Sequence, residues 1–288
     1  MTWLPEQVSR SKRLLALVAW TYMLMSIGCG TWIGNPKDPG KDPPPPSGNS
    51  TITLKVHGEL PTALQLAEAK IDVVGVSGSV IGSLTLTQAR VALKEIKLKL
   101  TNSDTQERQE FKGPFVVDLL SNQMRPDPGT IEVDAGSYTD IKLKLAKLEK
   151  DEISGVVAEN DPLIERSIYL TGTYRPDGGD PVTIVMDFDL DEEFVLAQSG
   201  STFGGMNILE GQTNPVIIAF RLDRWFDFRG AEADLSGLEG DIVLTKDGDD
   251  AAKSVREAIK ENVKQSAKFG KDDDGDGKLE DEEDSEDD

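Results

Sequence analysis

Apolar residues recur at every second position through most of this chain, from Ser50 to about Thr245. Such alternation is typical of strands that bury one face and expose the other, as in antiparallel sheets. Turn sequences rich in proline, aspartate and glycine, such as residues 125–129 and 175–179, separate the runs. The pattern predicts a mainly β body over residues 51–246, built as an antiparallel β-sandwich. The clearest apolar sets are Ile52, Leu54 and Val56; Ile141, Leu143 and Leu145; and Val182, Ile184, Met186, Phe188 and Leu190.

Two stretches of the body depart from simple alternation. The apolar phase slips by one residue between Leu93 and Ile96, which predicts a β-bulge at the intervening Lys94 and Glu95. The acidic stretch of residues 147–162 leaves open whether the body forms one or two subdomains.

The only cysteine, Cys29, directly follows a short apolar run. A basic segment at residues 10–13 precedes this run, which covers residues 14–28 and is shorter than the roughly 20 residues that a spanning helix needs. A basic segment followed by a short apolar run predicts a secretory signal peptide over residues 1–28.

The four residues Ser26-Ile27-Gly28-Cys29 resemble the lipobox of bacterial lipoprotein signals. The resemblance implies cleavage before Cys29, acylation of its sulfur and, because Gly30 rather than aspartate follows, residence at the outer membrane. The alternative is an ordinary signal peptide with Cys29 left as a free thiol, which is a liability in an oxidising compartment. Residues 29–50 are rich in proline and predict an extended linker that carries the body away from the lipid surface.

The charge of the chain is strongly acidic. It has 31 lysines and arginines against 52 aspartates and glutamates, a formal net charge of −21. This excess argues against nucleic acid as a partner and against adsorption to anionic lipid through basic residues. The expected link to a membrane is therefore the lipid anchor.

The apolar period changes after residue 246. Val255, Ile259 and Val263 recur every four residues, which predicts an amphipathic helix from Ala251 to about Lys268 within a segment spanning residues 247–270. Asp250 is placed to cap the start of this helix.

The acidic tail, residues 271–288, contains a match to the EF-hand calcium loop over residues 272–283. Calcium is a hard cation that takes several oxygen ligands, and a glycine at the sixth position permits the sharp turn. Leu279 stands where EF-hands carry the apolar residue that contacts a partner loop. We expect weak affinity of about 10⁻⁴–10⁻³ M and ordering that stays local to the loop. The alternative is an acidic tail that matches by chance. The predicted ligands are Asp272, Asp274, Asp276, Lys278 (through its carbonyl) and Glu283.

No catalytic residues are predicted. The only histidine, His57, falls in the polar phase of a strand, where we expect it to be exposed. Asp187, Asp189 and Asp191 share one strand face at a spacing that a glycosidase or a weak cation site could use, but a row of acids on a solvated strand face needs no chemistry to explain it. The aromatic residues Phe220, Trp225, Phe226 and Phe228 are expected to close one end of the core rather than to bind a sugar.

Three short blocks, Val117-Asp118-Leu119-Leu120, Gly136-Ser137-Tyr138-Thr139 and Asp187-Phe188-Asp189, resemble an uncharacterised family of β-sandwich bacterial lipoproteins. The resemblance covers roughly Ile71 to Leu190 and implies no activity.

The sequence thus predicts a lipid-anchored, extracytoplasmic, non-enzymatic β protein of the bacterial outer membrane. Its expected ligand is calcium, and its expected role is structural or the binding of an envelope protein or a glycan. The alternative from a different class is a calcium-dependent extracytoplasmic hydrolase.

Overall fold

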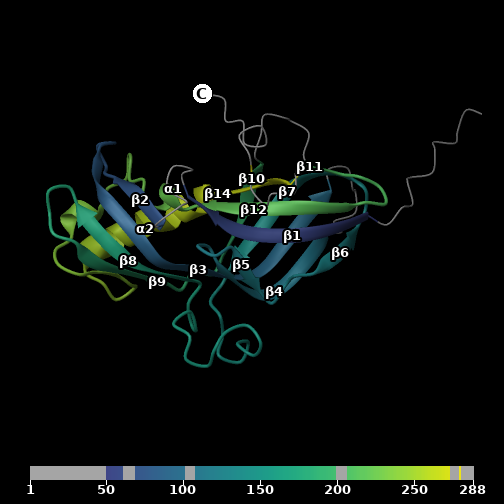
Figure 1. Cartoon of the computed structure of the whole chain (residues 1–288), viewed down its shortest axis with the longest axis horizontal. Helices are drawn as coiled ribbons and strands as arrows, with labels where there is room; N and C mark the ends of the chain where they lie inside the picture. The colour runs from purple at the N-terminus through teal and green to yellow at the C-terminus, as the bar shows by residue number, and fades with distance from the viewer. Residues whose placement is uncertain (1–49, 61–68, 101–107, 199–205, 273–278, 280–288) are drawn as a thin grey trace, which may run out of the picture. The chain divides into compact units, whose positions relative to one another are not determined.

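The computed structural model describes residues 50–60, 69–100, 108–198, 206–272 and 279. These residues all belong to one compact unit, Pro45–Asp288. The described chain is mainly β with a few helices (Figure 1). The predicted class, a mainly β sandwich-type fold, is confirmed.

The strands and helices follow one another along the chain with one long strand and one long helix among them. In chain order they are β1 (Ser50–Glu59), β2 (Ala69–Val74), β3 (Val80–Leu100), β4 (Arg108–Asp118), β5 (Gln123–Arg125), β6 (Thr130–Val133), β7 (Gly136–Leu145), β8 (Ile168–Pro176), β9 (Val182–Phe188), β10 (Glu192–Gln198), β11 (Met206–Ile208), β12 (Thr213–Arg221), α1 (Leu222–Trp225), the 3-10 turn η2 (Leu235–Gly237), β13 (Ile242–Leu244), α2 (Asp250–Ser266) and β14 (Ala267–Lys271).

The long strand β3 organises the larger sheet. Its first half pairs with β2 and β8, and its second half pairs with β4 and β7, all antiparallel. The register of β3 against both β4 and β7 shifts between Leu93 and Glu95. The predicted bulge is therefore confirmed, and it bends β3 where its partners change.

Strand β10 connects this larger sheet with a second one. It pairs with β7 through residues 192–196 and with β14 through residues 197–198, and the second sheet continues in the order β14-β12-β1-β6. The pairs β1/β12, β10/β14 and β13/β9 are parallel. The arrangement is therefore mixed rather than wholly antiparallel as the alternation had predicted, because alternation records which face is buried and not the direction of the neighbouring strand.

The core lies between the sheets and takes the alternating residues that the sequence predicts. Ile52, Leu54 and Val56 of β1 are buried, as are the apolar sets of β7 and β9 apart from the partly buried Val182. Phe220, Trp225, Phe226 and Phe228 are all fully buried, which confirms that they close the core. The rings of Phe220 and Trp225 meet edge to face with centroids 6.2 Å apart.

The acidic stretch of residues 147–162 joins β7 to β8, and both of these strands pair with β3. Its apolar residues Leu148 and Val156 form a small cluster with Leu163, Ala92 and Val116. The stretch therefore packs on the larger sheet and does not separate two subdomains.

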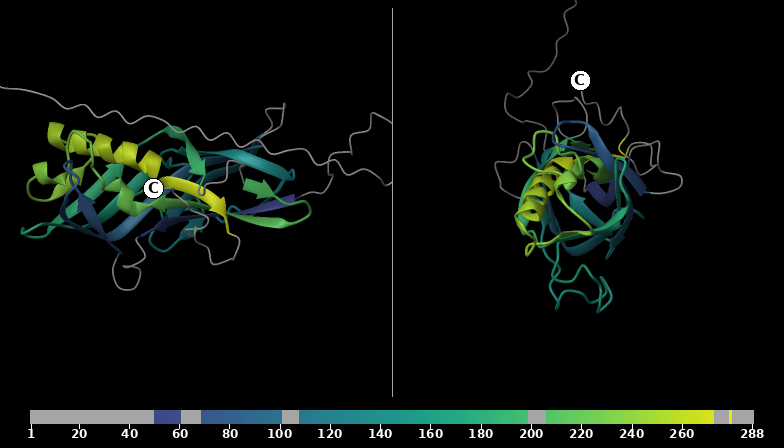
Figure 2. Two further views of the ribbon diagram at one scale, coloured as in Figure 1. Left: turned by 90° about the horizontal axis from the view of Figure 1, so that it is seen from above. Right: turned by 90° about the vertical axis from the view of Figure 1, so that its left-hand side faces the viewer.

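Helix α2 packs against α1, β10, β12 and β13 at one end of the fold (Figure 2). Its buried face includes Val255, Ile259 and Val263, as predicted. The cap is Asp249 rather than Asp250, since the Asp249 carboxylate accepts a hydrogen bond of 2.8 Å from the Ala252 N–H. The helix ends at Ser266, and the residues expected to finish it form β14, which lies between β10 and β12.

Ion pairs from Glu192 on β10 attach helix α2 to the sheet. Glu192 contacts Lys260 at 2.7 Å and Lys264 at 2.5 Å. Burial by itself raises the pKa of Glu192, but the hydrogen bonds from the two lysines outweigh it and the pKa is lowered.

Two other polar side chains fix turns. The Tyr138 hydroxyl donates to the Asp134 carbonyl at 2.9 Å, and burial raises its pKa to about 12. Gly136, at the start of β7, has φ of +148°, and a Cβ there would lie 2.8 Å from Leu100 Cδ1. Gly136 thus makes the turn that leads into β7. Asp234 accepts hydrogen bonds from the Val76 N–H at 2.8 Å and the Ser236 N–H at 2.9 Å.

Candidate functional site

The predicted calcium loop begins on the second sheet. Asp272 follows β14 directly, and its N–H donates to the Pro215 carbonyl at 3.1 Å. Its side chain is 1% exposed, and Oδ2 lies 3.2 Å from the Nζ of Lys55 on β1. The first position of the loop is therefore fixed against β12 and β1.

The eighth position returns to the same sheet. Leu279 is buried and forms a small cluster with Ile217 and Ala219 of β12. In the parallel β1/β12 pair Lys55 lies opposite Ile217, and His57 lies opposite Ala219, so these side chains share one face. The apolar side chain of Leu279 thus packs on the second sheet.

The remaining predicted functional residues lie outside the described part of the chain. These are Cys29 and the calcium ligands Asp274, Asp276, Lys278 and Glu283. Asp272 is the one predicted ligand whose position is described.

His57 differs from its prediction. It is 3% exposed, and its Nε2 lies 3.4 Å from Glu59 Oε1. The expectation of an exposed histidine is wrong because part of this face of β1 is shielded from solvent. It continues the face of β12 on which Ile217, Ala219 and Leu279 are buried.

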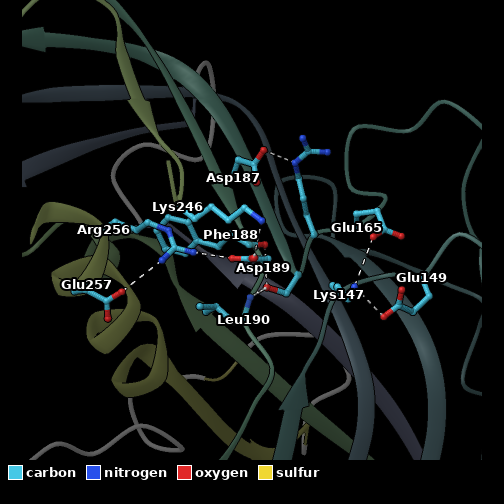
Figure 3. A network of polar contacts seen from close by, with 12 residues as sticks. Lys147, Glu149, Glu165, Asp187, Phe188, Asp189, Leu190, Lys246, Arg256 and Glu257 are labelled. Carbon is cyan, nitrogen blue, oxygen red and sulfur yellow. Dashed lines mark hydrogen bonds and ion pairs between the residues drawn. The ribbon is translucent and has the colours of Figure 1, made fainter. Parts of the chain in front are cut away.

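The acidic row at the end of β9 forms ion pairs, and Figure 3 shows those of Asp187 and Asp189. Asp187 pairs with Arg166, Asp189 Oδ1 lies 2.9 Å from Arg256 Nη2, and the exposed Asp191 lies 3.2 Å from Lys144. Each carboxylate thus has a different cationic partner.

Arg256 joins helix α2 to the end of β9. Its guanidinium lies over the Phe188 ring, 4.7 Å from the centroid, and its side chain is 11% exposed. The Nε atom is buried and has no hydrogen-bond partner among the described residues. A cation on an aromatic face gains electrostatic attraction, and this contact together with the Asp189 pair explains a buried arginine on the apolar side of the helix. Sequence reasoning missed this residue, although an arginine one turn after the buried Ala252 is a readable signal.

Two clefts flank the acidic row, of about 280 Å³ and about 260 Å³. Arg166 and Lys246 line the first beside Asp187 and Asp189, and Lys94 and two further lysines line the second. Among the described residues no three histidine, cysteine, aspartate or glutamate side chains are grouped as a metal site requires. The row therefore neutralises neighbouring cations, and its carboxylates do not converge on a common point.

Comparison with known families identifies one match. Residues 83–203 match the model of a domain of unknown function (DUF4382). The matched segment starts in β3, ends just beyond β10 and overlaps the Ile71–Leu190 region whose sequence blocks resemble an uncharacterised family. Searches of curated proteins and of solved structures found no match. Within the described residues, no helix has the length and apolar character to cross a membrane.

Proposed function

We propose that this protein is a lipid-anchored, extracytoplasmic, non-enzymatic β protein of the bacterial outer membrane with a calcium-binding C-terminal loop. Its role would be structural, or the binding of an envelope partner or a glycan. The observation that carries the calcium assignment is the placement of Asp272 and Leu279. The first and eighth positions of the loop pattern lie on one face of the second sheet.

This placement supports calcium binding because it restricts the conformations open to the loop before an ion binds. Asp272 is held at the end of β14 and Leu279 is packed on β12, so both ends of the six-residue segment between them are anchored on one sheet. Fixing both ends in advance lowers the entropy lost when the ligands gather around an ion. Calcium is therefore expected to order the loop and also to affect the second sheet, on which both ends of the segment lie.

Lys55 supplies a test of the site that leaves all five ligands intact. Its ammonium is 3.2 Å from Asp272 Oδ2 and would compete with a divalent cation for that oxygen. Lys55→Met should therefore tighten calcium binding severalfold in calorimetry on the mature chain. Lys70→Met, on β2, is the matched control and should leave the affinity unchanged.

The loop residues give the complementary test. Asp272→Ala and Glu283→Gln should each remove most calcium binding, whereas Asp287→Ala, which lies beyond the loop, should change little. Calcium should bind more tightly than magnesium, which demands a smaller octahedral shell and dehydrates reluctantly. Equal weakening by all three variants would show that the tail binds cations as a diffuse polyanion.

The lipid anchor is proposed from the signal, the single cysteine and the proline-rich linker. Cys29→Ser should move the protein from the membrane to the soluble periplasmic fraction and abolish labelling by an acyl donor. Ser47→Ala, in the same linker, is the control and should leave both unchanged. Equal membrane partition of the Cys29→Ser form and the unaltered protein would refute the anchor.

The absence of an enzymatic role is proposed from the acidic row. Asp187 and Asp189 are each paired with an arginine, which favours a structural use of these carboxylates. A screen against glycoside, ester and peptide substrates tests this. Turnover that disappears in Asp187→Asn while folding is retained would establish the hydrolase instead.

A further inference from the structure

A basic cleft of about 360 Å³ opens where β12, α1 and the end of α2 meet. Four cations line it, with Asp227 as the only acid and Asn262 among the neutral residues. Such a concentration of positive charge stands out in a chain whose net charge is −21. The four cations are Arg221, Arg224, Arg229 and Lys268.

Two carboxylates form ion pairs with these cations, Asp227 in the lining and Asp223 beside it. The Asp227 carboxylate accepts hydrogen bonds from Arg229 Nε at 3.0 and 3.1 Å and lies 3.9 Å from Arg224 Nη1. Hydrogen bonding from Arg229 lowers the pKa of Asp227 despite its burial. Asp223 lies 3.6 Å from Arg221 and 4.0 Å from Arg224. The residues that line the cleft are thus mostly cationic.

The course of the C-terminal chain leads toward this cleft. Asp272 lies beside Pro215, near the start of β12, and Leu279 lies against Ile217 and Ala219, further along the same strand. Leu279 therefore lies further along β12 than Asp272 does, in the direction in which β12 runs. The next residue of β12 on that face is Arg221, about 6.6 Å beyond Ala219 at about 3.3 Å per residue.

The segment that follows Leu279 is chemically matched to the cleft. Residues 280–288 comprise eight acids and one serine. Nine residues reach at most about 30 Å, several times the distance from Ala219 to Arg221. Lys268 lies opposite Ala219 in the β12/β14 pair, so a cation of the cleft is adjacent to the Leu279 contact itself.

We propose that the acidic C-terminal segment, residues 280–288, occupies this basic cleft of its own chain. Anionic lipid is the less favoured occupant on geometric grounds. β1 runs parallel to β12, with Thr51 opposite Thr213, so the proline-rich linker joins the body at the other end of these strands from Arg221. The proposal does not depend on calcium and is tested in its absence.

Cross-linking with a water-soluble carbodiimide tests the proposal on the mature chain in a chelator. The reagent joins a lysine amine to a nearby carboxylate as an amide and takes up the lost water as a urea. Mass spectrometry should find Lys268 joined to residues 280–288. The pair Lys142–Glu193, 2.8 Å apart, is the internal positive control. The yield of the Lys268 product should fall at least fivefold in Arg224→Glu and at high salt, which screens charges separated by more than a few ångströms.

Two outcomes would overturn the proposal. One is formation of the Lys142–Glu193 product with no Lys268 product. The other is a Lys268 product that joins isotopically light and heavy copies, which would place the tail in the cleft of a second molecule. Circular dichroism on Arg224→Glu separates loss of docking from loss of fold. A chain ending at Leu279 verifies the assignment, because it must lack the product.

Discussion

Leu279→Ala is the sharpest test of the C-terminal contacts because the residue lies beyond the last strand. The change removes three carbons, and each buried methylene contributes about 0.8 kcal/mol, so about 2 kcal/mol is the upper limit. Leu279 is 9% exposed and its described cluster contains only Ile217 and Ala219. Because this contact is small, we expect Leu279→Ala to lower the free energy of unfolding by about half of that upper limit, about 1 kcal/mol.

Urea denaturation monitored by tryptophan fluorescence measures this loss, with an unchanged m-value as the sign that the unfolded state is unaffected. Leu209→Ala is the matched control, since Leu209 is 46% exposed and should cost less than about 0.5 kcal/mol. If both variants unfold at the same urea concentration, Leu279 does not rest on the sheet. Both the calcium loop geometry and the course of the tail toward the basic cleft would then lose their support.

Three further changes test the polar contacts of the body. Glu192→Gln should cost about 1–2 kcal/mol at pH 7, and its effect should shrink in urea titrations below pH 4, because a lowered carboxyl pKa contributes stability that is lost as the pH falls through it. Asp234→Ala, which removes a buried cap with a lowered pKa, should cost about 1–2 kcal/mol and lower the midpoint of thermal unfolding. Tyr138→Phe should cost about 1 kcal/mol in urea, and it should remove from an ultraviolet titration the phenol whose pKa burial raises to about 12.

The faces of the strands could be predicted because alternation is a local property. Ile52, Leu54 and Val56 point inward, and the phase slip before Ile96 marks a real bulge. The pairing of the strands could not be predicted, because it depends on contacts between residues far apart in sequence. The helical pattern wrongly extends into β14, because the five residues of this strand, Ala267–Lys271, are too few to show a period of their own.

For the candidate sites too, local sequence patterns could be recognised, but contacts between residues far apart in sequence could not. The loop pattern at residues 272–283 is local and can be recognised, whereas the contact of Asp272 with Lys55 joins residues 217 positions apart. Arg256 was missed because its partner Asp189 and the Phe188 ring belong to another element. The basic cleft was missed because its arginines are interspersed with the aromatic residues of 220–228, which were correctly assigned to the core.

Strand β14 is the last strand of the described chain, yet it lies between β10 and β12, which are made earlier. Until residues 267–271 emerge from the ribosome or a translocation channel, the facing edges of those two strands have no partner. Unpaired strand edges are templates for association with other chains. Completion of the fold must therefore wait for residues 267–271, and a chain shortened before Ala267 would leave a sheet with unpaired strand edges rather than a smaller version of the same protein.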